Sequence, residues 1–327
     1  MYSKFSCINW CYSARPFFFI CAKDVSNKIW RLVIVKLQKE KAKSLISIFL
    51  ELSKPNILSL VLVATFLGYY LGNLGLGSID ILLYTLLGTS MTAAGSGALN
   101  HYLEREADSY MTRTKNRPLP AKLISPTKVL IFGIVMVIIG TILLLLKVNM
   151  LTGFLALLTA FLYTLVYTPL KSITWLNTSI GSIPGALPIV GGWTAAKGEV
   201  ETMAWVLFAI MYLWQHPHFY AIAWICKEDY LKANYKMLPV IDSTGNRTLR
   251  QIFWHLLLMV PISLLPVLLG SMGLIYLLGV TIITCAFFIS AIPLAKNQSV
   301  KSALILLKAS VFYLPALLLI IIVDLKI

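Results

Sequence analysis

The most constraining feature of this 327-residue chain is a series of apolar segments of about twenty residues that recurs from Asn56 to the C-terminus. As an α-helix, a segment of that length crosses the ~30 Å hydrocarbon core of a bilayer. Nine such segments are predicted, at residues 56–72, 80–99, 128–147, 150–169, 173–194, 202–224, 251–269, 273–293 and 302–323. The expected fold class is all-α, a polytopic membrane protein with a bundle of nine transmembrane helices and polar loops that form a cytoplasmic cap.

Composition and charge agree with a membrane protein. Hydrophobic residues make up 58% of the chain and charged residues 13%, whereas soluble domains carry about 25% charged residues. The net charge of +15 would suggest nucleic acid as the partner of a soluble chain. If the N-terminus is cytoplasmic, however, every Lys and Arg except Lys147, Lys197 and Lys326 falls on the cytoplasmic side, as the positive-inside rule requires. The expected surroundings are therefore a lipid bilayer, and no nucleic acid is expected.

Residues 1–50 differ from the rest of the chain. They are basic, their apolar patches are too short to span a bilayer, and no small-residue cleavage site follows them, so a secretory signal is not indicated. We expect a poorly ordered basic arm at 1–50, followed by one membrane domain at 51–327. Because Asp24, Glu40 and the many lysines fit a transit peptide poorly, the bacterial inner membrane is the preferred location over the mitochondrial one.

The first long polar loop predicts a metal site. Asn100, Glu104 and Asp108 are spaced i, i+4, i+8, so they share one face if the second apolar segment continues as a helix. Three oxygen-bearing side chains on one face suit Mg²⁺, which takes one or two carboxylates and completes its coordination with water and substrate phosphate.

Three alternating basic residues follow these acids. Arg113, Lys115 and Arg117 alternate along the loop before Pro118. Arginine binds phosphate oxygens bidentately and lysine adds a point charge, so acids followed by bases fit a metal–diphosphate. An acidic helix end followed by ordinary positive-inside residues is the alternative from spacing alone.

A second polar loop on the same side repeats this pattern. Glu228 and Asp229 are flanked by Lys227, Lys232 and Lys236. His216 and His218 flank Pro217 near the membrane boundary, and their i, i+2 spacing does not favour a shared metal or haem. Hydrogen bonding to a substrate and plain interfacial packing both remain open for these two histidines.

An aromatic pair precedes a single lysine between the fourth and fifth segments. Tyr163, Tyr167 and Lys171 follow one another at intervals of four residues. Tyrosine rings beside a lysine could shield a cation and hold a phosphate, but an aromatic belt at the membrane interface would show the same residues.

Taken in order, these motifs resemble those of the UbiA-type intramembrane prenyltransferases, and specifically the haem-farnesylating branch. The resemblance covers about residue 50 to the C-terminus. It rests on Asn100-x-x-x-Glu104-x-x-x-Asp108 with Arg113-Thr-Lys-Asn-Arg117, on Glu51-Leu-Ser-Lys-Pro55, Tyr167-Thr-Pro-Leu-Lys171, Pro184-Gly-Ala-Leu-Pro188, Trp214-Gln-His-Pro-His-Phe219 and Met237-Leu-Pro-Val240. The chain departs from the general family pattern at His101 and Ala233, where aspartates are usual, which leaves open whether one or two magnesium ions bind.

The resemblance implies transfer of the farnesyl group of farnesyl diphosphate to a vinyl group of haem B, with addition of water, to give haem O for a downstream haem O-modifying enzyme. It implies three groups of site residues. Asn100, Glu104, Asp108 and Asp229 would hold Mg²⁺; Arg113, Lys115, Arg117, Lys171 and Lys227 would bind diphosphate; and Tyr163, Tyr167, Trp214, His216 and His218 would shield the allylic cation or line the substrate pocket.

Three other functions are weighed against this one. A prenyltransferase acting on a quinone precursor or a chlorin would share the diphosphate site. A secondary transporter would also be polytopic, but its ionisable residues would lie near the bilayer midplane, whereas nearly all acids here lie at segment ends on one side. A structural subunit for respiratory-complex assembly would have no need of Glu104 or Asp108.

Overall fold

The computed structural model describes residues 44–325; residues 1–43 and 326–327, and with them most of the expected N-terminal arm, lie outside the described part. All regular elements in the described part are helices. In chain order they are α2 (Leu45–Leu52), α3 (Pro55–Asn73), α4 (Ile79–Tyr110), α5 (Pro126–Lys147), α6 (Met150–Phe161), the π-helix η2 (Leu162–Tyr167), α7 (Thr168–Ile173), α8 (Asn177–Lys197), α9 (Thr202–Ile225), α10 (Lys227–Lys232), α11 (Leu238–Ile241), α12 (Asn246–Leu268), α13 (Leu274–Asn297) and α14 (Val300–Asp324).

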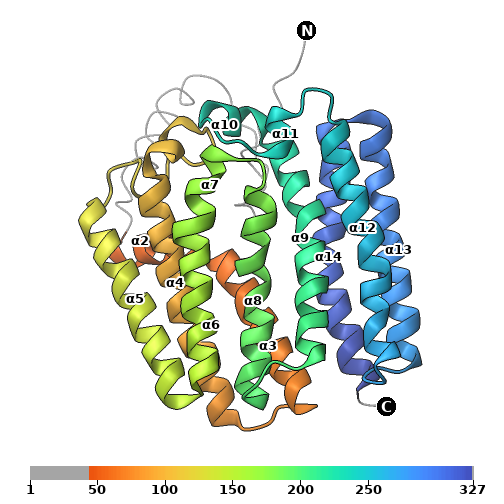
Figure 1. The fold of residues 1–327 in the computed structure, drawn as a ribbon. Coiled ribbons are helices and arrows are strands. Elements are labelled where there is room, and N and C mark those ends of the chain that lie inside the picture. Colours follow the sequence, from red (N-terminus) through yellow and green to blue (C-terminus); the bar gives the residue numbers. More distant parts are fainter. Residues whose placement is uncertain (1–43, 326–327) are drawn as a thin grey trace, which may run out of the picture.

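The long helices run side by side as one bundle, with the short helices α10 and α11 over one end (Figure 1). Six segments are long and apolar enough to cross a membrane: α3, α5, Met150–Ile173 (α6 to α7), α12, α13 and α14. The expectation of an all-α polytopic bundle is confirmed to this extent. The helices α4, α8 and α9 run alongside these six but are not among them: α4 ends in a charged stretch, and α9 carries Gln215, His216 and His218.

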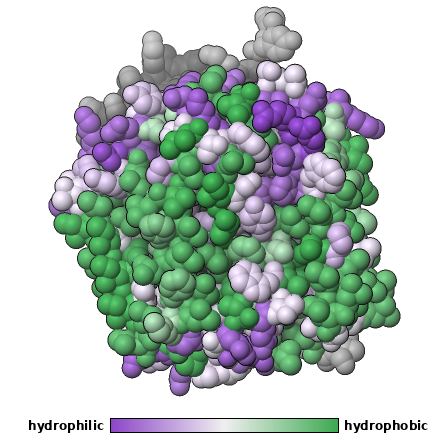
Figure 2. Space-filling model, viewed as in Figure 1, coloured by the Kyte–Doolittle hydropathy of each residue, from purple (hydrophilic) through white to green (hydrophobic). Residues whose placement is uncertain are grey.

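The surface shows where lipid would contact the bundle. Figure 2 shows a broad apolar band around the middle of the visible face and hydrophilic residues at both ends, most densely at the end that carries α10 and α11. Large side chains such as Ile131, Ile138 and Leu278 are 57%, 50% and 57% exposed. Exposing so much apolar surface to water would cost free energy, whereas the hydrocarbon of a bilayer can cover it without that cost.

Helix α4 extends the bundle into the cap. Its 32 residues correspond to about 48 Å at the α-helical rise of ~1.5 Å per residue, well beyond the ~30 Å of a bilayer core. The C-terminal third therefore continues past the apolar band. This part of the helix carries the three predicted metal ligands.

Two glycines let α3 and α8 pack almost backbone to backbone. A Cβ atom at Gly68 would lie 1.9 Å from the carbonyl oxygen of Ile189, and one at Gly192 would lie 1.9 Å from that of Thr65. Helices in a bilayer associate mainly through close packing, because lipid removes the hydrophobic driving force. Small residues at the crossing allow that packing.

Gly192→Ala should destabilise the bundle, since the added methyl group would force α3 and α8 apart. We expect the free energy of unfolding to fall by about 1–3 kcal/mol, the usual cost of overpacking. Gly191→Ala is the matched control, because a Cβ atom there meets no atom within 4 Å. Thermal unfolding in detergent compares the two, and equal melting temperatures would contradict the packing argument.

Candidate functional site

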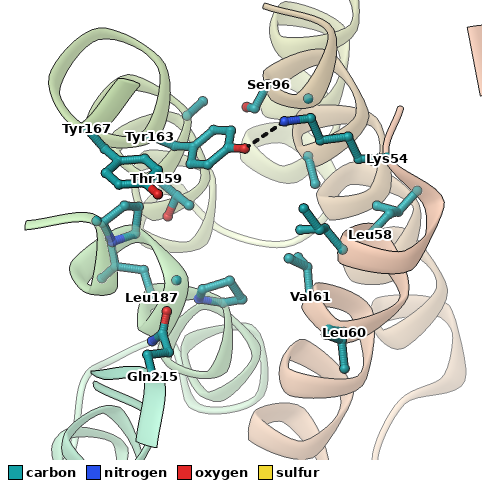
Figure 3. Close-up of a pocket in the computed structure, with 18 of the residues that line it drawn as sticks. Lys54, Leu58, Leu60, Val61, Ser96, Thr159, Tyr163, Tyr167, Leu187 and Gln215 are labelled. Atoms are coloured by element: carbon teal, nitrogen blue, oxygen red, sulfur yellow. Dashed lines mark hydrogen bonds between the residues drawn. The ribbon is translucent and has the colours of Figure 1, made fainter. Parts of the chain in front are cut away.

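One large cavity, of about 390 Å³, enters the bundle from the end that carries the cap. Its walls come from α3, α4, α6, η2, α8 and α9, and cap residues such as Tyr230 and Tyr235 close over it. Charged and aromatic side chains line the cap end and mainly apolar ones line the depth. In Figure 3, Leu58 and Val61 of α3 face Leu187 of α8 across the apolar part.

Lys54 reaches the cavity because the chain makes an unusual turn before α3. The residue before a proline avoids the α-helical region, and Lys54, which precedes Pro55, takes a left-handed conformation with φ 51°. This turn separates α2 from α3 and directs the side chain inward. The Nζ atom donates to Asn100 Oδ1 and, at 3.3 Å, to the Tyr163 hydroxyl (Figure 3).

A π-helical turn presents the next group of residues. Pro169 has no N–H to donate within the helix, and the preceding turn widens so that the Thr168 N–H donates to Tyr163 O, five residues back. π-helical turns of this kind are frequent at functional sites. With this turn in place Tyr163, Tyr167 and Lys171 all line the cavity, and the two tyrosine rings lie 5.8 Å apart.

The acids of α4 are buried against cations from other segments. Glu104 is 6% exposed and accepts a 2.5 Å hydrogen bond from Lys171 Nζ. Asp108 is fully buried, and both its carboxylate oxygens accept from Arg117 Nη1, at 2.9 and 2.8 Å. Asn100 donates to Thr168 Oγ1 at 2.8 Å. The predicted shared face of Asn100, Glu104 and Asp108 is thus confirmed as a buried face.

The cap end of the cavity has more positive than negative side chains. Four cationic and two anionic residues line it: Lys54, Arg113, Arg117 and Lys171, with Glu104 and Asp108. Lys54 lies just outside the span Pro55–Asn73, and burial lowers the pKa of its ammonium group. The negative charge of Glu104 opposes this effect, whereas the positive charges of Arg117 and Lys171 add to it, and the resulting pKa is about 7. An anion with at least two negative charges would balance this end of the cavity.

The acids are suited to a hard cation that is only partly held by the protein. No group of three or more His, Cys, Asp or Glu side chains that could hold a metal occurs in residues 44–325. Glu104 and Asp108 nevertheless offer carboxylate oxygens at the cavity wall, next to cations that would bind an anionic ligand. Mg²⁺ fits such a donor set, because it takes one or two carboxylates and fills its other positions with water and phosphate oxygens.

Asp229 holds the first polar loop. Its two carboxylate oxygens accept from the backbone N–H groups of Thr112 and Arg113, at 3.0 and 3.1 Å, and Asp229 does not line the cavity. Burial raises the pKa of this carboxyl, but these hydrogen bonds outweigh it and lower the pKa below its usual range. The contact is therefore retained above the usual carboxyl range and lost only as the pH falls through the lowered pKa.

Two of the predicted phosphate-binding residues are outside the cavity. Lys115 is exposed, and Lys227 donates to the carbonyl oxygen of Asp242 at 3.4 Å. By contrast, Arg113, Arg117 and Lys171, which were also predicted to bind diphosphate, line the cavity.

The predicted aromatic and histidine residues fall into two environments. Trp214 and His218 line the cavity with their rings stacked at 4.9 Å, and each bonds to Ser310, Trp214 Nε1 to the carbonyl oxygen and His218 Nδ1 to the hydroxyl. His216 faces away, stacked on His255 at 3.6 Å and bonded to Ser179. The prediction that the i, i+2 pair does not share a ligand is consistent with this separation.

Among the residues that line the cavity, the sequence analysis gave no site role to Lys54, Gln215, Tyr230 and Tyr235. A signal existed for Lys54, a lone basic residue before the proline that begins the first apolar segment. Gln215 had one too, within the Trp-Gln-His-Pro-His-Phe motif. The positions of Tyr230 and Tyr235 depend on how the cap folds back, which the sequence pattern does not indicate.

A helical bundle around a cavity with acids and cations at one end and apolar walls beyond suits an intramembrane enzyme that acts on a lipid with an anionic head group. The UbiA prenyltransferase family model matches residues 61–314, and the chain belongs to this family. It is 42% identical over 276 residues to a protoheme IX farnesyltransferase of Solibacter usitatus, covering 82% of this chain and 94% of that protein. It is 44% identical over 277 residues to one of Salinibacter ruber, covering 84% and 98%.

Solved structures confirm the fold. The chain is similar to a digeranylgeranylglyceryl phosphate synthase with a TM-score of 0.73 and 21% identity, covering 86% of this chain and 99% of the other. It is also similar to a UbiA homologue from Archaeoglobus fulgidus bound to GPP and Mg²⁺, with a TM-score of 0.60 and 16% identity, covering 86% and 100%.

Asp229→Ala should release the first polar loop, because two hydrogen bonds to a charged group, each of about 1.5–3 kcal/mol, would be lost. We expect trypsin to cleave after Arg113 and Lys115 about tenfold faster or more. Glu228→Ala is the matched control, an exposed acid at the adjacent position. Mass spectrometry of the early fragments measures the rates, and unchanged cleavage in Asp229→Ala would contradict the anchoring role.

Proposed function

We propose that this protein transfers the farnesyl group of farnesyl diphosphate to a vinyl group of haem B, with addition of water, to give haem O. The observation that carries the proposal is the large cavity whose cap end is rich in cations and whose depth is apolar. Such a cavity matches a diphosphate joined to a hydrocarbon chain. The relatives that are 42% and 44% identical are named protoheme IX farnesyltransferases, which supports haem B as the acceptor.

The first step follows from the charges at the cap end. Lys54, Arg113, Arg117 and Lys171 bind the diphosphate and stabilise the charge that develops as it leaves. The bond between the farnesyl C1 and oxygen breaks, and its electron pair departs with the pyrophosphate. An allylic farnesyl cation remains, facing the rings of Tyr163 and Tyr167, whose π-electrons stabilise positive charge.

The second step consumes the cation. The electron-rich haem vinyl group attacks farnesyl C1 and forms the new carbon–carbon bond. Positive charge moves to the vinyl carbon next to the porphyrin ring, a water oxygen adds there, and one proton is lost to solvent. The apolar walls, which include Leu58, Val61 and Leu187, keep other water away from the cation before the vinyl group reaches it.

Magnesium is part of the proposal. Glu104 and Asp108, which line the cavity, would hold it at the cap end, where it would neutralise diphosphate oxygens. Asn100 does not line the cavity and stays a predicted ligand. For Asp229, the position against the backbone of Thr112 and Arg113 supports a loop-anchoring role, and its service as a metal ligand stays a prediction. Lys115 and Lys227 were also predicted to bind diphosphate; because they lie outside the cavity, we propose that the four cations lining it bind the diphosphate instead.

The same proposal includes the topology. We infer that α4, α8 and α9 cross the bilayer with the six apolar spans, giving nine crossings in a single domain at 51–327, and that the N-terminus and the cap lie in the cytoplasm. The concentration of basic residues in the loops of the cap end supports this orientation. The bacterial inner membrane is the proposed location, and a haem O-modifying enzyme is the proposed recipient of the product.

Asp108→Ala should lower haem O formation about a hundredfold or more, since one charge-stabilising group of a preorganised site is removed. Haem is extracted from membranes of a host without this activity and resolved by chromatography and mass. Wild type should yield a species heavier than haem B by one farnesyl group plus water. Glu106→Ala is the matched control, because Glu106 is an exposed acid on the same helix.

Each outcome of this experiment has a distinct meaning. Equal product from wild type and Asp108→Ala would keep the reaction and overturn the role of Asp108. Haem B alone from folded, abundant wild-type protein would overturn the acceptor, and quinone precursors or chlorins would then be tested with the same membranes.

A further inference from the structure

The depth of the cavity can be estimated from its walls. On α3, Lys54 at the cap end and Thr65 at the far end both line the cavity, eleven residues apart. On α6 and η2, Tyr163 and Thr152 line it, again eleven residues apart. At the helical rise of ~1.5 Å per residue, both walls are about 16 Å long.

This depth is close to the length of one particular prenyl chain. The main chain of a farnesyl group has twelve carbons, which extend to about 14 Å with bonds of ~1.5 Å. By the same measure a geranyl chain, with eight main-chain carbons, extends to about 9 Å and would leave nearly half of the depth empty, and a chain with one more five-carbon unit than farnesyl would exceed it.

The far end is closed by hydrogen bonds between α6 and α8. Thr152 Oγ1 lies 2.9 Å from Thr194 Oγ1, and the Asn149 side chain donates to the Thr194 carbonyl oxygen at 2.8 Å. Thr152 and Thr194 are 2% and 0% exposed. Gly191, three residues before Thr194, is the last residue of α8 that lines the cavity.

Gly191 differs from the other glycines that line the cavity. A Cβ atom at Gly181 would lie 2.4 Å from the Tyr167 ring, and one at Gly185 would lie 1.9 Å from Gln215 Oε1, whereas one at Gly191 meets nothing within 4 Å. The residues Gly181, Pro184, Pro188 and Gly191 recur at helical spacing along the cavity wall, so the space beside Gly191 is the far end of the cavity.

We propose that Gly191 determines the length of the prenyl chain that this protein accepts, because its missing side chain leaves room for the third five-carbon unit of a farnesyl group. This inference rests on the proposed prenyl transfer and adds the residue that sets its donor specificity. A larger side chain at residue 191 would fill the space that the last unit occupies, while the cap end stays unchanged.

The test compares Gly191→Leu with wild type on geranyl, farnesyl and geranylgeranyl diphosphates, with haem B and Mg²⁺, using purified protein and product mass. Wild type should prefer farnesyl. In Gly191→Leu the ratio of kcat/KM for farnesyl to that for geranyl should fall about tenfold or more, as expected when a pocket loses room for several methylene groups. Thr89→Leu, on the α4 side of the cavity, should shift the ratio in the same direction.

Ala286→Leu is the control, because it adds bulk on an exposed position of α13 outside the cavity and should leave the ratio unchanged. An unchanged ratio in Gly191→Leu, or an equal loss with both diphosphates, would overturn the proposal. Should Gly191→Leu fail to fold, Gly191→Val takes its place under the same criteria.

Donor binding separates this proposal from the proposed haem chemistry. The rise in melting temperature with each diphosphate and Mg²⁺ requires no haem. If wild type makes no haem product, the proposed function fails, but a preference for farnesyl that moves to geranyl in Gly191→Leu still supports the role of Gly191. Equal shifts with all three diphosphates in both proteins would overturn it.

Discussion

The structure depends on two carboxylates that are buried in a helical bundle and neutralised by cations from other segments. Removing Glu104 and Asp108 from water costs several kcal/mol for each charge unless partners are close. Lys171 and Arg117 supply those partners at 2.5 and 2.8 Å. Because the four residues lie on α4, α7 and the first polar loop, the two ion pairs fix the relative positions of these segments at the cap end.

Three local features bring further charged and aromatic side chains to the same end of the cavity. The π-helical turn before Pro169 brings Lys171 and both tyrosines to the cavity, and the left-handed residue Lys54 brings a further cation from the start of α3. Asp229 then holds the loop that carries Arg113 and Arg117 through backbone N–H groups. The result is a site with more positive than negative charge, to which the diphosphate of the proposed substrate would supply the missing negative charge.

Much of this arrangement was predictable from the sequence. Apolar segment length predicted the bundle, and i, i+4, i+8 spacing predicted the face shared by Asn100, Glu104 and Asp108, because both depend only on helix geometry. The contacts of Asp229 and Lys227 were not predictable, since identical acidic and basic residues can face a cavity or a neighbouring loop. The position of Tyr235 could not be predicted either, because it depends on how the cap folds back on the bundle.

In the proposed function, the cations that line the cavity bind the diphosphate, and the other basic residues of the loops do not. The most direct measurement is calorimetric binding of a non-hydrolysable farnesyl diphosphate analogue, with Mg²⁺, to wild type, Lys171→Met and Lys115→Met. Lys171→Met should weaken binding about tenfold or more, because a charge-assisted contact to phosphate is lost. Lys115→Met should bind as wild type does, since Lys115 is exposed outside the cavity. Equal affinities for all three proteins, or a loss confined to Lys115→Met, would contradict the account.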